Sequence, residues 1–274
     1  GTSGAASITH FDASAFKTRF ACELKGLDIS AFIHRKEQRR LDLFSQYALI
    51  CTDQAVQDAG VAADDSIDKD RVGVIWSSGI GGLNVVEEEI TGYATGDGTP
   101  GFNPFFIPKM IVDIAPGHIS MRYGFRGINF APVAACASST IALIDALNYI
   151  RLGKADVIVA GGSEAPITPG GVGGFGAMRA LSTRNDECET ASRPFDATRD
   201  GFVIGEGAGA LVIEELEHAK RRGATILAEL AGGGMSADAH HLTAPHPEGL
   251  GAKNVMTLAL DDAGLNPDEL DHIN

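Results

Sequence analysis

The residue best placed for covalent chemistry is a cysteine between a short run of small residues and a long apolar segment. Cys136 belongs to the sequence AACASST, residues 134–140. Residues 129–135 are apolar and mostly small, which predicts the end of a buried strand. From Ser138 to Leu152, apolar residues recur at helical spacing, and Gly153 is suited to end that helix. We therefore expect Cys136 at, or just before, a helix N-terminus.

A helix N-terminus is a place where a cysteine can act as a nucleophile. The first backbone N–H groups of a helix have no partner within it, and they favour the thiolate of Cys136 over the thiol. The effect is worth about 0.3–1 kcal/mol, so a neighbouring base or imidazole would add to it. A thiolate in this position indicates acyl-group chemistry. Position alone leaves equally open the alternative of an unreactive cysteine that packs as a small apolar side chain.

A short basic run is the second chemically distinctive feature. The sequence HRKEQRR, residues 34–40, contains four lysines and arginines, whereas the whole chain has a net charge of −14. That net charge argues against nucleic acid or an anionic membrane as the main partner. A basic patch on an acidic protein favours docking of a strongly acidic partner, with a solvated helix face as the alternative.

Composition limits the class of protein. The chain has 274 residues, of which 44% are hydrophobic, enough to bury a large core. It contains neither an uncharged apolar run of 18 residues nor a charged and then apolar N-terminus, so we expect no membrane span and no signal peptide. The four cysteines are far apart without a CxxC pair, which predicts free thiols in a reducing, cytoplasmic compartment.

Three other patterns could suggest chemistry, but each has a simpler explanation. GVGGFG, residues 171–176, spells GxGxxG, yet no strand directly precedes it and no long apolar helix follows, so we expect no nucleotide site. The acidic and histidine residues at 238–246 lie among prolines that break regular ligand geometry, so we expect no metal site. Ser163, Glu164 and Asp145 are explained by strand-end and helix-surface positions.

The elements around the cysteine alternate between strands and helices, which predicts an α/β fold with buried sheets. Expected strands lie at 71–77, 156–160, 208–214 and 226–231. Expected helices lie at 83–91, 109–123, 216–222 and 249–263, with Pro116 marking a kink or boundary. A helix that ends in Ala-Gly, then a linker and a strand, occurs near residue 60 and again near residue 264. This shared plan indicates a duplicated fold.

Several motifs, taken together, resemble the β-ketoacyl-acyl-carrier-protein synthases, and most closely the type II enzymes. Besides the cysteine segment, they are GGSE (161–164), GGFGAMRALSTRND (173–186), SRPFD (192–196), RDGFV (199–203), GEGAG (205–209) and SADAHHLT (236–243). They occur in the family's order along essentially the whole chain, which strongly disfavours a purely structural cysteine.

The resemblance implies a thiolase-like fold of five αβαβα layers. It places residues 1–222 in an N-terminal half that lacks its first strand, and residues 223–274 at the start of a C-terminal half. It implies a homodimer and a decarboxylative Claisen condensation without a cofactor. Cys136 would accept an acyl group from acyl carrier protein, and the malonyl group of a second carrier would then extend it by two carbons.

The resemblance also assigns roles to individual side chains. Those implied to contact the substrate are Ile80, Phe106, Phe175 and Thr243, with Phe175 in a Gly-Gly-Phe-Gly loop and the bulk of Ile80 setting chain length. Asp238 and His241 lie in a loop that the family moves as a gate. Cations implied to dock the acidic carrier protein are Lys36, Arg39, Arg40 and Arg179. Core packing is the alternative for the apolar side chains.

One departure from the family concerns its other catalytic groups. The family uses two histidines and a lysine beside the cysteine, and the first histidine is expected two residues beyond Asn274. We therefore expect this chain to be a fragment, able to be acylated slowly but poor at condensation. The alternatives are a polyketide-type ketosynthase, a thiolase relative and a non-catalytic chain-length-factor-like partner. The last of these lacks the cysteine, so Cys136 argues against it.

Overall fold

The fold is described from a computed structural model, which covers residues 2–274. The strands are β1 (Ala6–Ser7), β2 (Phe20–Ala21), β3 (Val72–Ser77), β4 (Asn129–Phe130), β5 (Val157–Glu164) and β6 (Gly207–Glu214). The helices are α1 (Arg35–Gln38), α2 (Leu43–Asp58), α3 (Leu83–Thr95), α4 (Phe106–Met110), α5 (Ile114–Tyr123), α6 (Ser138–Arg151), α7 (Pro169–Ala177), α8 (Leu216–Arg221) and α9 (Leu250–Ala263).

A mixed sheet with the strand order β4-β3-β5-β6 forms the centre of the molecule. β3 runs parallel to both β4 and β5, whereas β6 runs antiparallel to β5, with Glu164 opposite Gly207. Every residue of β3 is buried, as are the first seven of β5. Strands that are apolar throughout require cover on both faces, and this is the pattern the sequence predicts for 71–77 and 156–160.

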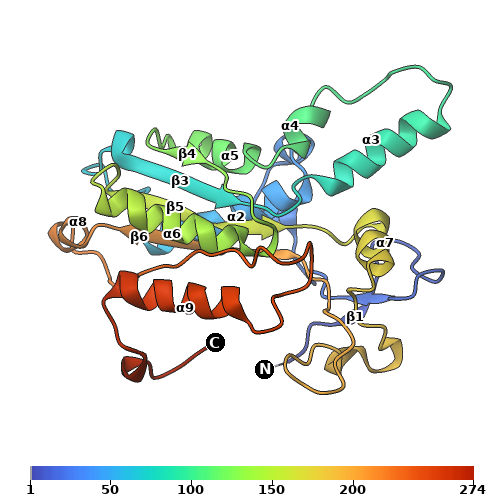
Figure 1. Cartoon of the computed structure of the whole chain (residues 1–274). Coiled ribbons are helices and arrows are strands. Elements are labelled where there is room, and N and C mark those ends of the chain that lie inside the picture. The colour runs from blue at the N-terminus through green and yellow to red at the C-terminus, as the bar shows by residue number, and fades with distance from the viewer. Residues whose placement is uncertain (1) are drawn as a thin grey trace.

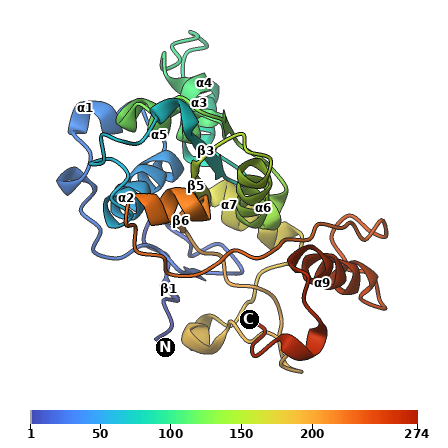
Figure 2. The same cartoon turned by 90° about the vertical axis from the view of Figure 1, so that its left-hand side faces the viewer.

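Helices cover both faces of this sheet, so the described part of the chain has an α–β–α layering (Figures 1 and 2). Side chains of β3 alternate between the two cores, as expected for a strand. Val74 and Trp76 pack in the core beneath α2 and α5, whereas Ile75 packs against Ala142 and Ala146 of α6. The predicted α/β class is confirmed.

Two parts of the chain lie outside these layers. α3 and α4 form an arm that projects from the sheet (Figure 1). α9 lies alongside α6, where the Arg151 guanidinium donates to the Asp262 carboxylate at 2.9 Å and to the Ala231 carbonyl at 2.6 Å (Figure 2). Among residues 2–274, no helix combines the length and apolarity needed to span a membrane.

Some predicted elements differ from the structure. No strand forms at 226–231, where the Leu227 side chain is 83% exposed, because no neighbouring strand in the described chain offers backbone partners. The strand expected up to residue 135 contains only Asn129 and Phe130. The helix expected at 109–123 is interrupted at 111–113, so the predicted boundary exists. Pro116 lies in the first turn of α5, where its missing N–H costs nothing.

Candidate active site

Cys136 lies where the sequence predicts, in a turn of 3₁₀ helix, Ala135–Ala137, that leads directly into α6. Its side chain is exposed. No side chain caps the N-terminus of α6, and the Ser138 N–H donates to the Ala135 carbonyl of the preceding turn. The local geometry therefore leaves the Cys136 side chain accessible at the start of a helix.

The backbone around the cysteine is held in an uncommon conformation. Ala135 has φ +48°, a left-handed value that non-glycine residues adopt rarely and mostly where surrounding structure imposes it. The buried Ser138 imposes it, because its hydroxyl donates to the Ala135 carbonyl at 2.7 Å and accepts from the Ala134 N–H at 2.8 Å. The turn thus presents Cys136 in one fixed orientation.

Close packing between strand ends and helix sets the position of this turn. The Ser77 hydroxyl, at the end of β3, donates to the Gly161 carbonyl at 3.3 Å and lies 3.5 Å from the Ser139 hydroxyl. At Gly162 of β5, a Cβ would overlap Ser139 Oγ and lie 3.0 Å from the Ser77 carbonyl oxygen. Only glycine allows the first turn of α6 to approach the two strands this closely.

Glu164, the last residue of β5, ties a second loop to the cysteine turn. Its carboxylate accepts from Ser78 Oγ at 2.7 Å, from the Gly79 N–H at 2.6 Å and from the Ile80 N–H at 3.3 Å. A Cβ at Gly79 would lie 3.3 Å from the carbonyl oxygen of Ala135. The loop with Ile80 is therefore fixed beside the turn with Cys136. The sequence predicts only a strand-end position for Glu164, although the GGSE motif contains it.

The aromatic side chains predicted to contact an acyl chain have aromatic partners. Phe106 opens α4 and stacks on Phe102, with ring centroids 5.7 Å apart. Phe175 packs edge-to-face against Phe202 at 5.4 Å. The predicted Gly-Gly-Phe-Gly loop is wrong, because Phe175 lies within helix α7, whose N-terminus Thr168 caps by accepting from the Gly171 N–H. Of the three apolar candidates, only Ile80 is placed beside the cysteine turn by described contacts.

The predicted gating loop is held mainly by its own side chains. The Asp238 carboxylate accepts from the His246 N–H at 3.2 Å, and His241 Nδ1 accepts from the Thr243 N–H at 3.2 Å. Thr243 is exposed, and the Ser236 hydroxyl donates to the Gly251 carbonyl at the start of α9. Within residues 2–274, no group of three or more His, Cys, Asp or Glu side chains is arranged to hold a metal ion.

The predicted docking cations occupy two separate surfaces. Lys36, Arg39 and Arg40 are exposed on α1 and the turn after it, and the Arg40 guanidinium lies 5.3 Å from the centre of the Phe105 ring. Arg179 follows α7 and lines a different hollow, of about 400 Å³, together with Lys17. The structure does not bring Arg179 together with the α1 cations.

Comparisons with known proteins give consistent results along the chain. Residues 7–219 match the family model of the beta-ketoacyl synthase N-terminal domain, and residues 227–274 match that of its C-terminal domain. The chain is 44% identical over 276 aligned residues to "3-oxoacyl-[acyl-carrier-protein] synthase I, chloroplastic" of Arabidopsis thaliana. It is 46% identical over 274 residues to "3-oxoacyl-[acyl-carrier-protein] synthase 2" of Coxiella burnetii. Both alignments cover all of this chain.

A solved structure of a beta-ketoacyl synthase from Burkholderia phymatum superposes with a TM-score of 0.88 at 36% identity, over 98% of this chain. The chain spans 58% of the Arabidopsis relative, 66% of the Coxiella relative and 65% of the Burkholderia chain. The described α/β layering is thus shared with a ketosynthase.

Proposed function

Because this chain belongs to the β-ketoacyl synthase family, we propose that Cys136 is the acyl-carrying nucleophile of a 3-oxoacyl-acyl-carrier-protein synthase. The reaction is the decarboxylative Claisen condensation that lengthens a fatty acyl chain by two carbons. The observation that supports this most directly is an exposed Cys136 in a fixed turn at the uncapped N-terminus of α6. Identities of 44% and 46% to relatives named for this activity support it further.

The proposed first step is a thioester exchange. The Cys136 thiolate attacks the carbonyl carbon of an acyl thioester on the carrier's phosphopantetheine arm, and the carrier thiolate leaves and takes up a proton. An incoming thioester can approach Cys136 because its side chain is exposed at the start of α6.

In the second step, a malonyl thioester loses carbon dioxide. The resulting carbanion attacks the acyl carbon, and the thiolate of Cys136 departs. Covalent capture divides one difficult reaction into two easier ones.

The side chains that the family resemblance assigns to the substrate take matching roles in this proposal. Ile80, held beside the turn by Glu164, limits the space for the acyl tail, and Phe106 and Phe175 line its further course. Thr243 lies along the phosphopantetheine arm. Asp238 and His241 belong to a loop that moves during the cycle.

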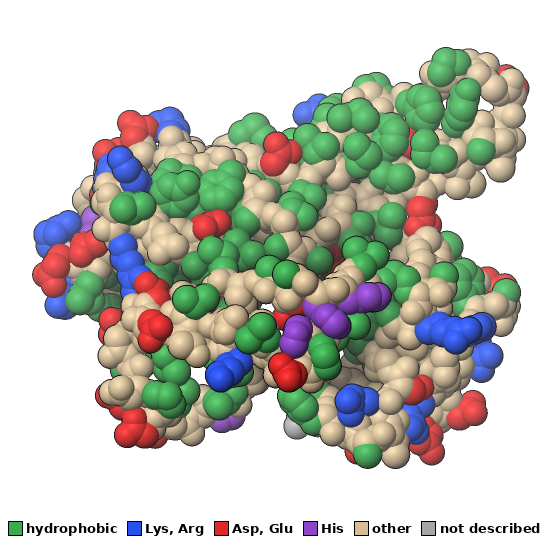
Figure 3. Space-filling model, in the orientation of Figure 1, with side chains coloured by type: hydrophobic (Ala, Val, Ile, Leu, Met, Phe, Trp, Pro, Cys, Tyr) green, Lys and Arg blue, Asp and Glu red, His purple; other side chains and the backbone are tan. Residues whose placement is uncertain are grey.

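We also propose a homodimer with the five-layer fold, in which residues 1–222 and 223–274 belong to successive halves. The arm of α3 and α4 supports the dimer, because exposed apolar side chains gather on it, including Ile90, Tyr93 and Ile107 (Figure 3). All four cysteines are free, which supports a reducing compartment such as the cytoplasm.

The test separates the two half-reactions. The chain is incubated with hexadecanoyl-acyl carrier protein, and intact-protein mass spectrometry measures acyl transfer. We expect one acyl group on Cys136 and none on Cys136→Ser, whereas an unmodified wild-type chain would contradict the proposal. Cys51 is an internal control, since its half-buried position raises the pKa of its thiol and should slow its reaction.

Condensation is then measured by adding malonyl carrier protein to the acylated chain. We expect it to be much slower than acylation, because the family resemblance implies two histidines and a lysine that assist this step and assigns none of them to residues 1–274. Condensation as fast as acylation would contradict that expectation while leaving the role of Cys136 intact.

A further inference from the structure

A carboxylate of α3 reaches the N-terminus of α7, which lies below α3 in Figure 1. Glu87 accepts a hydrogen bond from the Thr168 hydroxyl and another from the Gly170 N–H, the latter at 2.9 Å. The Thr168 hydroxyl oxygen in turn accepts from the Gly171 N–H at 2.9 Å and so caps the helix. Glu87 Oε1 therefore holds both the capping side chain and a backbone N–H that has no partner within α7.

Helix α7 has few other contacts that could fix its position. Five of its nine residues are glycine, the weakest helix former apart from proline. Val172 and Phe175 pack in an apolar cluster with Ile167 and Leu181. Because the glycines bring no side chains to this packing, the position of α7 depends strongly on the contacts at its N-terminus.

The other end of the link, the start of α3, is fixed beside the cysteine turn. The buried Asp42 carboxylate accepts from the Val85 N–H at 3.0 Å, in the first turn of α3. Ile80, which lies three residues before this helix, belongs to the loop beside Cys136. Glu87 therefore connects the helix that follows Ile80 to the helix that contains Phe175.

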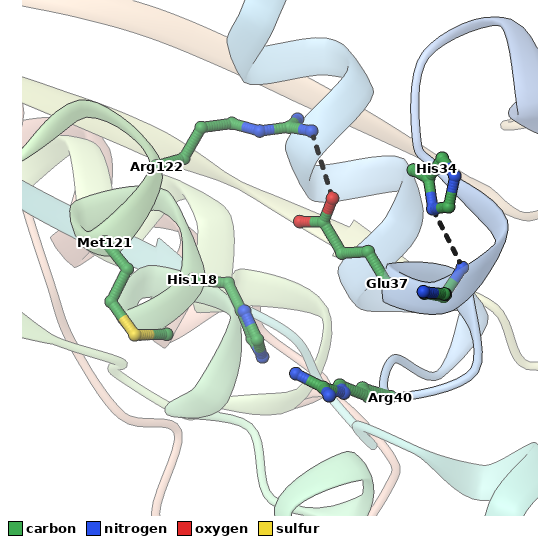
Figure 4. Close-up of a pocket in the computed structure, with 7 residues that line it drawn as sticks. His34, Glu37, Arg40, His118, Met121 and Arg122 are labelled. Atoms are coloured by element: carbon green, nitrogen blue, oxygen red, sulfur yellow. Dashed lines mark hydrogen bonds and ion pairs between the residues drawn. The ribbon is translucent and has the colours of Figure 1, made fainter.

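This contact differs from the ion pair that joins α1 to α5. There the Glu37 carboxylate lies 3.6 Å from the Arg122 guanidinium across a hollow (Figure 4), and both side chains are partly exposed. Exposed pairs of this kind contribute little. The Thr168 side chain, in contrast, is only 3% exposed, so loss of the Glu87 carboxylate would leave a buried hydroxyl without its acceptor.

We propose that Glu87 is a positioning residue for chain-length preference, because it holds α7, and Phe175 with it, at a fixed place relative to Ile80. This inference rests on the proposed function, in which the acyl tail passes Ile80 and continues past Phe175. Without the Glu87 contact, α7 shifts and the wall of the channel near Phe175 is no longer in place. A long acyl tail senses that change, whereas a short acyl group stays near the sulfur and does not.

The test compares a long and a short acyl group on the same proteins. Intact-protein mass spectrometry measures how fast Cys136 is acylated by hexadecanoyl- and by butanoyl-acyl carrier protein. We expect Glu87→Ala to lower the ratio of the hexadecanoyl rate to the butanoyl rate at least about fivefold. Glu88→Ala makes the same change at the next, exposed residue of α3 and should alter the ratio less than about twofold. Glu87→Gln keeps an oxygen that can accept both hydrogen bonds, so it should restore the wild-type ratio.

Thr168→Val tests the same contact from the side of α7 and replaces Glu87→Ala if that variant does not fold. It removes the hydroxyl while keeping the shape of the side chain, and it should lower the ratio as Glu87→Ala does. The double variant should lower the ratio no further than either single variant, because both remove one shared contact. Effects that multiply in the double variant would show two separate roles and overturn the inference.

The outcomes separate this inference from the proposed function. A merely structural role for Glu87 would lower the Tm and slow both acyl groups equally, and that result overturns the inference. If wild type is acylated and Glu87→Ala and Thr168→Val leave the ratio within about twofold, the inference is also overturned while the proposed function stands. If Cys136 of the wild-type chain accepts neither acyl group, the proposed function is wrong and the inference falls with it.

Discussion

Replacing Glu164 by glutamine should reveal whether the loop at 78–80 must be fixed for acyl transfer. The carboxylate accepts three hydrogen bonds from this loop, whereas the glutamine amide retains one oxygen and turns an NH₂ group toward other donors. A hydrogen bond to a charged group is worth about 1.5–3 kcal/mol, and the partial exposure of Glu164 places the loss near the lower end. A loss of about 1.5 kcal/mol corresponds to about a tenfold change in rate.

We therefore expect Glu164→Gln to slow acylation of Cys136 by hexadecanoyl-acyl carrier protein about tenfold. The Tm should fall by about 3–6 °C, at 2–4 °C per kcal/mol for a chain of this size. Alkylation of Cys136 by iodoacetamide should change less than twofold, because that small reagent does not use the loop with Ile80. Mass spectrometry follows both modifications in parallel.

A matched control exists in Glu215, at the N-terminus of α8. Its carboxylate also accepts two backbone N–H bonds, from Glu217 at 3.1 Å and from His218 at 2.7 Å. Glu215→Gln should cost stability without slowing acylation. If Cys136 of Glu164→Gln is acylated as fast as in wild type, the loop at 78–80 does not need to be fixed for acyl transfer. Equal slowing of acylation and alkylation would instead show that the cysteine turn itself had moved.

Two further predictions concern stability. Gly162→Ala places a Cβ against Ser139 Oγ, so overpacking should cost about 1–3 kcal/mol and lower the Tm by several degrees in thermal unfolding followed by circular dichroism; an unchanged Tm would contradict the close packing. For Glu214, burial raises the pKa, but hydrogen bonds from Arg222 and His218 outweigh burial and lower it below its usual 4.5. The contribution of Glu214 to stability is complete above that value and is lost as the pH falls through the lowered pKa. In urea unfolding between pH 6 and pH 3, the free energy of unfolding should therefore fall more steeply for wild type than for Glu214→Gln.

Local patterns in the sequence predicted the elements nearest the cysteine well. The helix expected from Ser138 to Leu152 is observed as Ser138–Arg151, because its apolar spacing is regular and Gly153 follows with φ +66°. The strands at 156–160 and 208–214 are likewise present. The segment at 226–231 failed because strand pairing depends on a partner, and apolar residues there face solvent.

Local sequence patterns did not predict contacts between residues that are far apart in the chain. Helix α7 contains five glycines in nine residues, which disfavours a helix by about 1 kcal/mol for each one. It forms because Thr168 caps it and because Glu87 of α3 accepts from the Gly170 N–H at 2.9 Å. The anchoring of residues 78–80 by Glu164 likewise requires β3 and β5 to be neighbours. The family motif included Glu164, but no local pattern gave its partners.

The reversed direction of β6 determines the route that the chain takes after this strand. β6 begins opposite Glu164, at the end of the strands that lies beside the Cys136 turn, and ends opposite Val157, at the other end of the strands. Helix α8 therefore starts at the end of the sheet away from Cys136. Residues 224–239 return along α6 (Figure 1), and Gly233 packs closely against Ile144. Lengthening this return path would displace the segment at Gly233 from α6, together with the loop at 236–243 that follows it.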